Sequence, residues 1–431
     1  MANIAVIGAG PMGLAAGLQL LKDGHDVTIF EADKVVGGMS ASFLFDGLKI
    51  ERYYHFICKS DHPLFDLLAE LGIVHKLKWV PTKMGYFYQN RLNDWGDPVA
   101  LLKFNGLGLV AKIRYGLMAF ISTKRKSWQR LDSVDAVSWI KRWIGDEAYS
   151  ILWKPLFDLK FHHYTPNLSA AWIWARLRRV GTSRKNIFQE QMGYLEGGSD
   201  TFLEAIERKI IALGGCIRLS SPITKVHLAN DRVTGVQVAA VREHFDAVVS
   251  TIPLPYVADL VPDLPEAVLN KYRSVENIAV VCVLAKLRLP LSKYFWLNIS
   301  DPEIDIPGFI EYSNLNPVGE HIIYAPYYMP GDHPDFQQPD SVFIERVRSY
   351  LLRINPELQI SDIVKIQAGR YRFAQPICPP KFLQTLPPIS PGIDNLIIAD
   401  TSYYYPEDRS ISESVKLGKE LAKAAQDKYA Q

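Results

Sequence analysis

Three glycines and one glutamate near the start of the chain have the spacing of a nucleotide-binding turn. Gly8, Gly10 and Gly13 form GxGxxG after the apolar segment "NIAVI", and Glu31 closes the next apolar segment, "DVTIFE". In such a turn the first glycine permits a tight bend, the second lets a pyrophosphate approach the backbone, and the third lets helix and strand pack closely. An acid about 20 residues further on accepts hydrogen bonds from ribose hydroxyls. We therefore predict a dinucleotide site.

Residues 45–57, "FDGLKIERYYHFI", could carry acid–base chemistry. Their most useful side chain is His55, because an unperturbed histidine has a pKa of about 6.5 and can transfer a proton near neutrality. The alternative is a histidine that only satisfies backbone contacts. Arg52 and Tyr54 precede His55 and are candidates for substrate binding.

Cations and aromatic side chains gather in residues 159–185, "LKFHHYTPNLSAAWIWARLRRVGTSRK". Arginine forks bind phosphate or carboxylate groups in two-pronged fashion, so Arg176 and Arg179 are candidates for holding an anionic substrate. The alternative is a solvated helix face, which charge runs usually are. The tyrosine-rich segment "IIYAPYYMP" offers Tyr328 as a pocket residue, or simply as a core aromatic.

The elements around these residues predict an α/β protein. The first 31 residues have a strand–helix–strand pattern, and "SVKLGKELAKAA" near the end of the chain has the pattern of a helix that follows the strand "NLIIAD". A chain of 431 residues with 48% hydrophobic content can bury a large core. The 48 basic and 46 acidic residues nearly cancel, so no nucleic-acid partner is expected.

Targeting and metal signals are weak. The four cysteines lack ligand-like spacing, so we expect reduced thiols, no metal site and a cytoplasmic protein. We expect neither a signal peptide nor a membrane span. Residues 107–122, "LGLVAKIRYGLMAFIS", predict an amphipathic helix that either packs on the core or makes peripheral membrane contact. The sequence gives no indication of the oligomeric state.

A second glycine pair follows Glu31 in "GGMSAS", residues 37–42. With GxGxxG and the acid, this pair resembles the N-terminal signature of the superfamily of FAD-dependent amine oxidases, protoporphyrinogen oxidases and phytoene desaturases. The resemblance implies that FAD is the cofactor. It also implies that FAD contacts Gly8, Gly10, Pro11, Met12, Gly13, Glu31, Ala32, Gly37, Gly38, Met39 and Ser40. Many members have an arginine where this chain has Met39, so that phosphate contact is lost or is supplied from elsewhere.

Later segments extend the resemblance. In residues 193–238 it implies that Val226 pairs with the adenine through its backbone. At "LIIAD" it implies that Asp400 meets the ribityl–phosphate region. It also implies that backbone N–H groups of residues 410–412 (Ser410, Ile411 and Ser412) face the pyrimidine end of the flavin, where a helix N-terminus stabilises negative charge.

The loop "YYYPEDR", residues 403–409, departs from the amine oxidases. We expect it to overhang the flavin ring, with Tyr404 and Arg409 joining His55 as catalytic candidates, unless it is only a solvated loop. Tyr371, in "GRYRFAQP", resembles a family position that reaches the flavin and is a further candidate for substrate binding.

The resemblance implies a Rossmann-like FAD-binding domain interleaved with a mixed α+β substrate domain. The expected FAD-binding segments are residues 1–75, 190–270 and 365–431, and the substrate segments are 76–189 and 271–364. The expected activity is oxidation of a small organic molecule (a porphyrin-like, polyprenyl, amine or sugar compound) by hydride transfer to the flavin.

Two other functions are compatible with the sequence. One is a nucleotide-sugar mutase related to UDP-galactopyranose mutase, although the fuller GPHIFHT-like histidine pattern of those enzymes is absent. The other is a cofactor-free binding protein, as Rab GDP dissociation inhibitors are on this fold.

Overall fold

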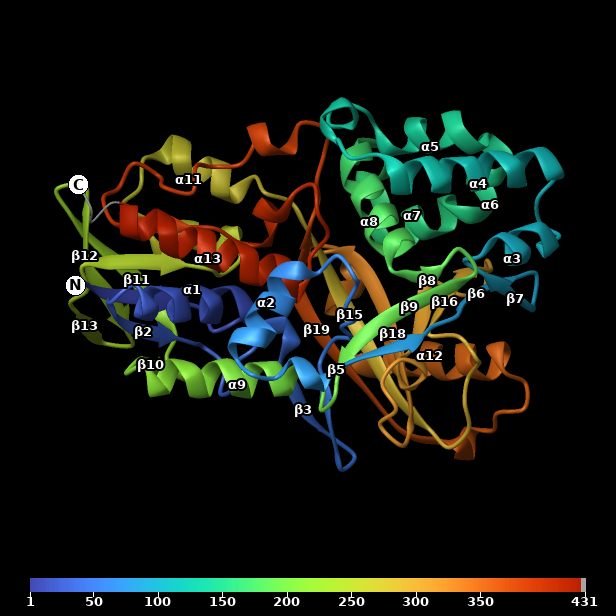
Figure 1. Ribbon diagram of the computed structural model, residues 1–431, viewed down its shortest axis with the longest axis horizontal. Helices are drawn as coiled ribbons and strands as arrows, with labels where there is room; N and C mark the ends of the chain where they lie inside the picture. The colour runs from blue at the N-terminus through green and yellow to red at the C-terminus, as the bar shows by residue number, and fades with distance from the viewer. Residues whose placement is uncertain (428–431) are drawn as a thin grey trace.

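A five-stranded parallel sheet forms one side of the molecule (Figure 1). The computed structural model describes residues 1–427. The strand order is β10-β2-β1-β14-β20. The strands are β1 (Asn3–Ile7), β2 (Asp26–Phe30), β10 (Cys216–Arg218), β14 (Ala247–Ser250) and β20 (Leu396–Ile398). Their central residues are apolar and buried, as expected for parallel strands covered on both faces.

Helices from distant parts of the chain cover this sheet. They are α1 (Pro11–Lys22), α2 (His62–Glu70), α9 (Ser199–Ala212) and α13 (Ile411–Asp427). Helix α13 packs directly on α1, and a Cβ added at Gly418 would lie 2.4 Å from the carbonyl oxygen of Met12. An antiparallel sheet lies near the sheet edge with the short helices α10 (Val257–Leu260) and α11 (Glu266–Arg273); its strands are β11 (Ile223–Ala229), β12 (Arg232–Val238) and β13 (Val241–Glu243).

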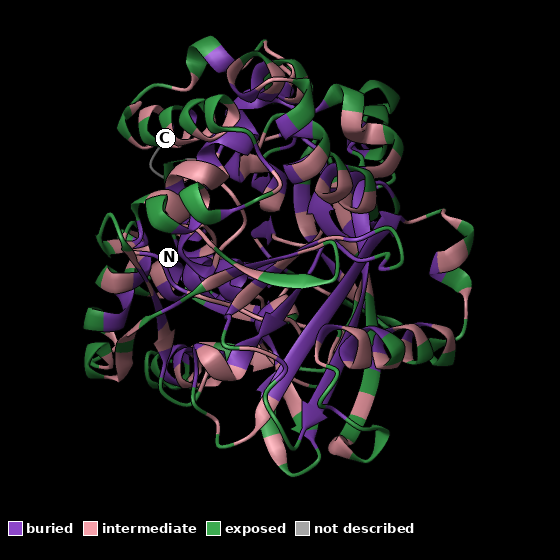
Figure 2. Cartoon of the chain, turned by 90° about the vertical axis from the view of Figure 1, so that its right-hand side faces the viewer, coloured by how far each residue is buried: buried purple, intermediate pink, exposed green. Residues whose placement is uncertain are grey.

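A seven-stranded mixed sheet forms the second body of the fold, in the order β19-β15-β18-β17-β16-β6-β7. Its strands are β6 (Met84–Tyr88), β7 (Arg91–Trp95), β15 (Asn277–Leu287), β16 (Trp296–Ser300), β17 (Gly308–Glu311), β18 (His321–Pro330) and β19 (Ile363–Pro376). Every residue of β15 is buried. Figure 2 shows the long central strands as buried, whereas buried and exposed residues alternate along the surrounding helices. Helix α12 (Asp340–Ile354) packs against this sheet.

A group of short helices lies beside the seven-stranded sheet, at the upper right of Figure 1. They are α3 (Pro98–Lys103), α4 (Leu109–Lys124), α5 (Ala136–Ile144), α6 (Asp146–Leu152), α7 (Lys154–Phe161) and α8 (Ala170–Thr182). Three of them begin at a side chain that accepts backbone N–H groups, namely Asp97, Asp135 and Ser169. Such caps satisfy donors that have no acceptor inside the helix.

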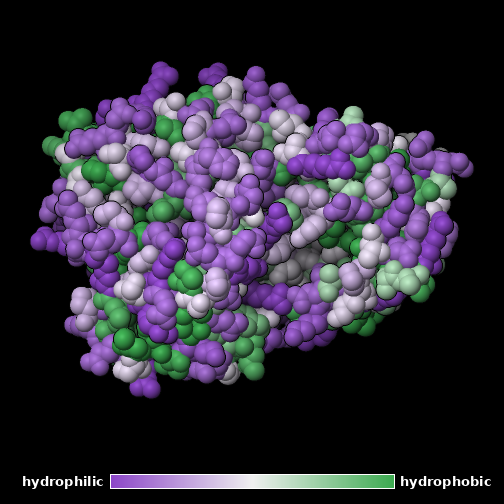
Figure 3. Space-filling model, turned by 180° about the vertical axis from the view of Figure 1, so that it is seen from behind, coloured by the Kyte–Doolittle hydropathy of each residue, from purple (hydrophilic) through white to green (hydrophobic). Residues whose placement is uncertain are grey.

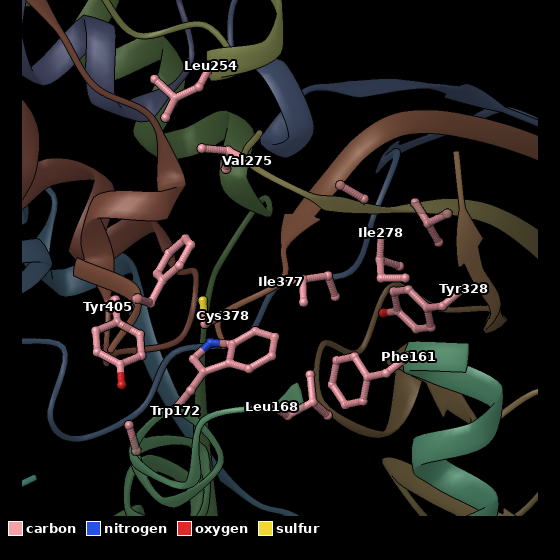
Figure 4. Close-up of a cluster of buried hydrophobic side chains, with 14 of the residues drawn as sticks. Phe161, Leu168, Trp172, Leu254, Val275, Ile278, Tyr328, Ile377, Cys378 and Tyr405 are labelled. Carbon is pink, nitrogen blue, oxygen red and sulfur yellow. The ribbon is translucent and has the colours of Figure 1, made fainter. Parts of the chain in front are cut away.

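Two small sheets connect these bodies. One is the hairpin of β3 (Ser42–Phe45) and β4 (Leu48–Glu51), and the other contains β5 (Leu77–Pro81), β8 (Arg184–Asn186) and β9 (Gln189–Leu195). Buried side chains fill the junction between the helices and sheets, as Figure 4 shows for Trp172 of α8, Phe161 of α7 and Tyr328 of β18.

The structure confirms the predicted α/β fold class, with a parallel sheet built from three separate parts of the chain. The exact domain boundaries stay a prediction. Within the described residues, no helix combines the length and apolar character needed to cross a bilayer.

Candidate active site

A single cavity of about 1690 Å³ brings most of the candidate residues together. It is lined by the N-terminal ends of α1 and α13, by the segment after β4, by α7 and α8, and by strands of the seven-stranded sheet. Ligand pockets in proteins usually measure about 300–1,000 Å³. This cavity therefore has room for a large cofactor and a second molecule. A hollow is also visible on the back face of the molecule (Figure 3).

The glycine turn has the geometry that a phosphate cradle requires. Gly8 has φ +100°, which favours glycine, and a Cβ at Gly13 would lie 1.9 Å from the carbonyl oxygen of Gly8. In contrast, a Cβ at Gly10 would meet no protein atom within 4 Å, and Gly10 lines the cavity with Pro11 and Met12. Gly8 and Gly13 thus shape the turn, whereas Gly10 leaves open space in front of the helix N-terminus, where anions bind.

The second glycine pair lies against this turn. The Gly37 N–H donates to the carbonyl oxygen of Ala9 at 2.8 Å, and a Cβ at Gly38 would lie 3.5 Å from Cα of Gly10. Gly38, Met39 and Ser40 line the cavity. The two glycine segments, 27 residues apart in the sequence, therefore form one continuous backbone surface.

The acid after β2 stands at the same end of the cavity. Glu31 accepts the backbone N–H groups of Ala9 and Asp33 at 2.8 and 2.9 Å, and Ala32 also lines the wall. Arg52 forms an ion pair with Asp33 at 2.5 Å, which lowers the pKa of that carboxyl. Asp33 follows Glu31 by two residues, so this pair holds Arg52 near the predicted nucleotide end, and the role of Arg52 in substrate binding stays a prediction.

Val226 lies behind the cavity wall, and its backbone contact with the adenine stays a prediction. It is completely buried in β11, opposite Val236 of β12, and is not among the residues that line the cavity. Ile223 and Thr224, at the start of the same strand, line it instead. The alternating pattern identified the strand, but it could not tell which end of the strand reaches the cavity.

Asp400 and the start of α13 lie at the cavity wall as predicted. The Asp400 carboxylate accepts the N–H groups of Ser402 and Leu254 at 2.8 and 2.9 Å, and burial raises the pKa of Asp400. The first N–H groups of a helix have no acceptor within the helix. The Ser410 hydroxyl accepts the N–H of Glu413, so the N–H groups of Ile411 and Ser412 remain available at the wall.

His55 lines the cavity, where its pKa departs from the ordinary value of a histidine. Burial, reinforced by the positive charge of Arg409, lowers the pKa of His55 to about 4. Its Nε2 lies 3.3 Å from the Ser40 hydroxyl. The imidazole is therefore neutral near pH 7, because the side chain is buried beside a cation, and its role in proton transfer stays a prediction.

The loop 403–409 is anchored by its tyrosines and is not a free flap. The hydroxyls of Tyr403, Tyr404 and Tyr405 bond to Pro387 O, Ser414 Oγ, and both Asp132 and Ser169. Tyr404 borders the cavity, but its hydroxyl is held by α13. Arg409 also lines the cavity and donates to the carbonyl oxygen of Ala374 in β19.

The arginines of α8 form ion pairs instead of a free cationic face. Arg179 binds Asp61 through two hydrogen bonds of 3.2 and 2.8 Å, and the side chains of this pair are only 9% and 6% exposed. Arg176 binds Asp408 at 2.7 Å and stacks over the ring of Trp172 at 4.3 Å. Both arginines line the cavity, but each has an acid partner, so the solvated-face alternative is wrong for these two.

Sequence reasoning missed Lys160 in α7. Its ammonium group lines the cavity 4.9 Å from the ring of Tyr328, and it forms no ion pair with any described residue. Burial, together with Arg176 and Arg409, lowers the pKa of Lys160 well below its ordinary value. The sequence does contain a signal for its burial. Lys160 follows Leu156 by four residues and Phe157 by three, so it lies on the same face of the helix as these two apolar side chains.

Aromatic side chains line the other end of the cavity. Tyr54 makes edge-on ring contacts with Trp296 and Tyr324 at 5.5 and 5.8 Å, and Tyr371 lies 6.5 Å from the ring of Tyr53. Tyr54, Tyr328 and Tyr371 are all at the wall, as predicted. This end offers an apolar surface with phenolic tips.

A profile of the flavin containing amine oxidoreductases matches residues 13–386. The chain belongs to this family. The match confirms the resemblance seen in the glycine signature, and FAD is the cofactor of the family.

Individual relatives of this flavin family are distant. The mitochondrial protoporphyrinogen oxidase of Nicotiana tabacum is 29% identical over 193 residues, which cover 42% of this chain and 37% of that protein. The zeta-carotene desaturase of Capsicum annuum is 23% identical over 431 residues, covering 86% of this chain and 72% of that protein. The chain thus spans less than half the length of the first of these relatives.

Solved structures share the fold across the whole chain. A putative protoporphyrinogen oxidase from Exiguobacterium sp. 255-15 superposes with a TM-score of 0.76 at 16% identity, covering 100% of this chain and 99% of that one. Cyclohexylamine oxidase from Brevibacterium oxydans superposes with a TM-score of 0.73 at 14% identity, with complete coverage of both chains. At these identities the likeness concerns the fold.

The residues at the glycine end of the cavity fit FAD. Open space at Gly10, the N-terminus of α1 and the Glu31 carboxylate provide a backbone surface for a pyrophosphate and an acceptor for a ribose. The N-terminus of α13 stands further along the same cavity and would face negative charge on the flavin.

Proposed function

We propose that this chain is an FAD-dependent oxidoreductase that oxidises a small organic molecule in the aromatic end of the cavity. The observation that carries the proposal is that one cavity runs from the glycine turn to a pocket with tyrosines and buried cationic side chains. When bound, FAD supplies the acceptor for two electrons, which it takes from the substrate as a hydride. The chain itself supplies orientation, a dry cavity and fixed charges.

The chain's own residues divide these tasks. The N–H groups of Ile411 and Ser412 stabilise negative charge at one edge of the site. Neutral His55 can accept a proton at one ring nitrogen and donate one at the other, with the Ser40 hydroxyl within 3.3 Å of Nε2. Arg409 is the cation beside His55 that would hold an anionic or carbonyl part of the substrate. Many family members have an arginine near the phosphates where this chain has Met39. Arg52 is a candidate to supply that positive charge.

A redox-neutral nucleotide-sugar mutase is the second candidate. Lys160, Arg176 and Arg409 face the same cavity, and Asp408 is the acid that pairs with one of them. Arg409 forms no ion pair with a carboxylate of the described residues, so its guanidinium favours a substrate with a phosphate group. Such an activity would need reduced flavin but would give an isomeric product.

The test uses FAD-loaded protein under anaerobic conditions with porphyrinogens, polyprenyl compounds, amines and sugar nucleotides. Loss of flavin absorbance with an oxidised product by mass spectrometry supports the oxidoreductase. An isomeric product formed only after reduction of the flavin supports the mutase. If the protein binds no FAD, both enzyme functions are excluded and a cofactor-free binding protein remains.

Site variants then test the assigned residues. Arg409→Gln and His55→Ala should keep bound FAD and slow flavin reduction by substrate, because a lost acid–base group is worth about 10²–10⁴-fold. Arg178→Gln is the matched control, because Arg178 is not among the cavity-lining residues and its side chain is 41% exposed. Equal rates in all three variants would remove both residues from the mechanism. The cytoplasmic location and the interleaved domain division are part of the same proposal.

A further inference from the structure

Helix α4 turns a row of large apolar side chains toward solvent. Leu109, Val110, Ile113 and Phe120 are 65%, 70%, 60% and 61% exposed, and Leu117 is also exposed. At 3.6 residues per turn, these five side chains fall within about 100° of the helix circumference. Only Met118 and Ser122 of this helix are buried. The other side of α4 packs against α5 and α8, so the choice between core packing and membrane contact stays open at this point.

The preceding helix extends this row. Val99 and Leu102 of α3 are exposed apolar residues, α3 contacts α4, and Lys112 of α4 donates to the carbonyl oxygen of Leu102 at 2.7 Å. Together these side chains form the apolar patch, which consists of Val99, Leu102, Leu109, Val110, Ile113, Leu117 and Phe120. Solitary exposed apolar residues are ordinary, but a contiguous group of this kind marks an interaction surface.

The segment that carries the apolar patch is basic, although Asp97 directly precedes it and caps α3. Residues 98–131 contain seven lysines and arginines and no acid, which leaves 41 basic and 46 acidic residues in the rest of the chain. The seven are Lys103, Lys112, Arg114, Lys124, Arg125, Lys126 and Arg130. In the described part of the chain, none of them forms an ion pair with a carboxylate. Lys112 and Arg114 donate to backbone carbonyl oxygens, but no carboxylate neutralises the charge of any of the seven, so the segment attracts an anionic partner.

The opposite side of α4 belongs to the cavity. Tyr115, Gly116, Ala119 and Thr123 line it, and Phe120 both lines the cavity and contributes to the apolar patch. Helix α4 is therefore a thin wall between the site and the patch. Whatever covers the patch also covers this wall.

We propose that the apolar patch rests on the surface of an anionic lipid bilayer. An exposed apolar stripe flanked by lysine and arginine is the pattern of a helix that lies in the plane of a membrane interface. Anionic headgroups complement the net positive charge of this segment. A second copy of the chain would bring two such cationic segments together, and the repulsion between like charges disfavours that arrangement.

The test is flotation of the full-length protein with vesicles of phosphatidylcholine, with or without phosphatidylglycerol. We expect binding to the mixed vesicles at low salt, weaker binding at high salt because salt screens exposed charges, and little binding to phosphatidylcholine alone. Ile113→Glu and Leu117→Glu should each weaken binding at least tenfold. Ile211→Glu, at an exposed apolar position of α9 away from the patch, should bind like the wild type.

A variant with fewer cations separates the electrostatic contribution to vesicle binding from the apolar one. Each lysine or arginine near an anionic surface strengthens binding about fivefold, so replacing Lys124, Arg125 and Lys126 with glutamine should weaken it about 100-fold. The proposal is overturned if the wild type does not float with the mixed vesicles at low salt. It is also overturned if Ile113→Glu floats normally, or if sedimentation shows a wild-type dimer that this substitution dissociates.

Discussion

Replacing Gly10 and Gly13 with alanine should affect two different properties: Gly10→Ala should weaken FAD binding, and Gly13→Ala should lower the stability of the apoprotein. A Cβ at Gly10 meets no protein atom within 4 Å, so Gly10→Ala should leave the free energy of unfolding of the apoprotein almost unchanged. The added methyl group enters the space in front of α1 where a pyrophosphate would approach. Each charge-assisted hydrogen bond lost there is worth about 1.5–3 kcal/mol, or roughly 10- to 150-fold in FAD affinity.

Gly13→Ala puts its Cβ 1.9 Å from the Gly8 carbonyl oxygen, whereas real Cβ contacts stay above about 3.0 Å. The helix must therefore move by about 1 Å, and α13 opposes this movement because Gly418 already packs against Met12. Overpacking of this kind costs about 1–3 kcal/mol, so the apoprotein itself should lose stability.

Urea unfolding with and without FAD separates the two cases. At a concentration 100 times its Kd, a ligand stabilises the folded state by about 2.7 kcal/mol. Gly10→Ala should unfold like the wild type without FAD and gain less from FAD, whereas Gly13→Ala should unfold earlier in both conditions. If Gly10→Ala gains as much from FAD as the wild type does, the phosphates do not lie at Gly10 and the cradle is misassigned.

Three further predictions concern buried charges. The pKa of His55 is about 4 in the folded protein and 6.5 in the unfolded chain, so stability falls as pH drops from 6.5 to 4, and His55→Gln should flatten that part of a urea-unfolding pH series. Arg179→Met should destabilise the protein by about 3–5 kcal/mol because Asp61 is left buried and unpaired, and Arg179→Met with Asp61→Leu should recover part of the loss in the same assay. Lys160→Met should raise the thermal midpoint near neutrality, with the gain shrinking as pH rises toward 10.5, and an unchanged midpoint would mean that the amine is well solvated.

The parts of the fold and site set by local patterns could be predicted from the sequence. GxGxxG followed by Glu31 fixed the turn, its helix and the second strand, because each feature depends on neighbours in the chain. The strand before Asp400 and the helix after Ser410 followed from composition and periodicity in the same way.

The remaining features depend on contacts between distant residues. Arg176 and Asp408 lie 232 residues apart, and the sequence predicts one as a substrate ligand and the other as part of a loop over the flavin. Their pairing depends on how two segments meet in space, and no local pattern encodes that. The pKa of His55 likewise depends on enclosure by the folded chain and on Arg409.

The order of assembly follows from the parallel sheet. Strand β1 pairs with β2 nearby, but also with β14, while α1 is covered by α13 from the end of the chain. Roughly 400 residues separate Ile7 from Ile411, which corresponds to about 20–80 s of synthesis at 5–20 residues per second. During that time α13 is not yet available to pack on α1, and the apolar side of α1 that it covers is exposed. A cofactor that binds only the completed cradle would therefore report that α13 has been made and has packed on α1.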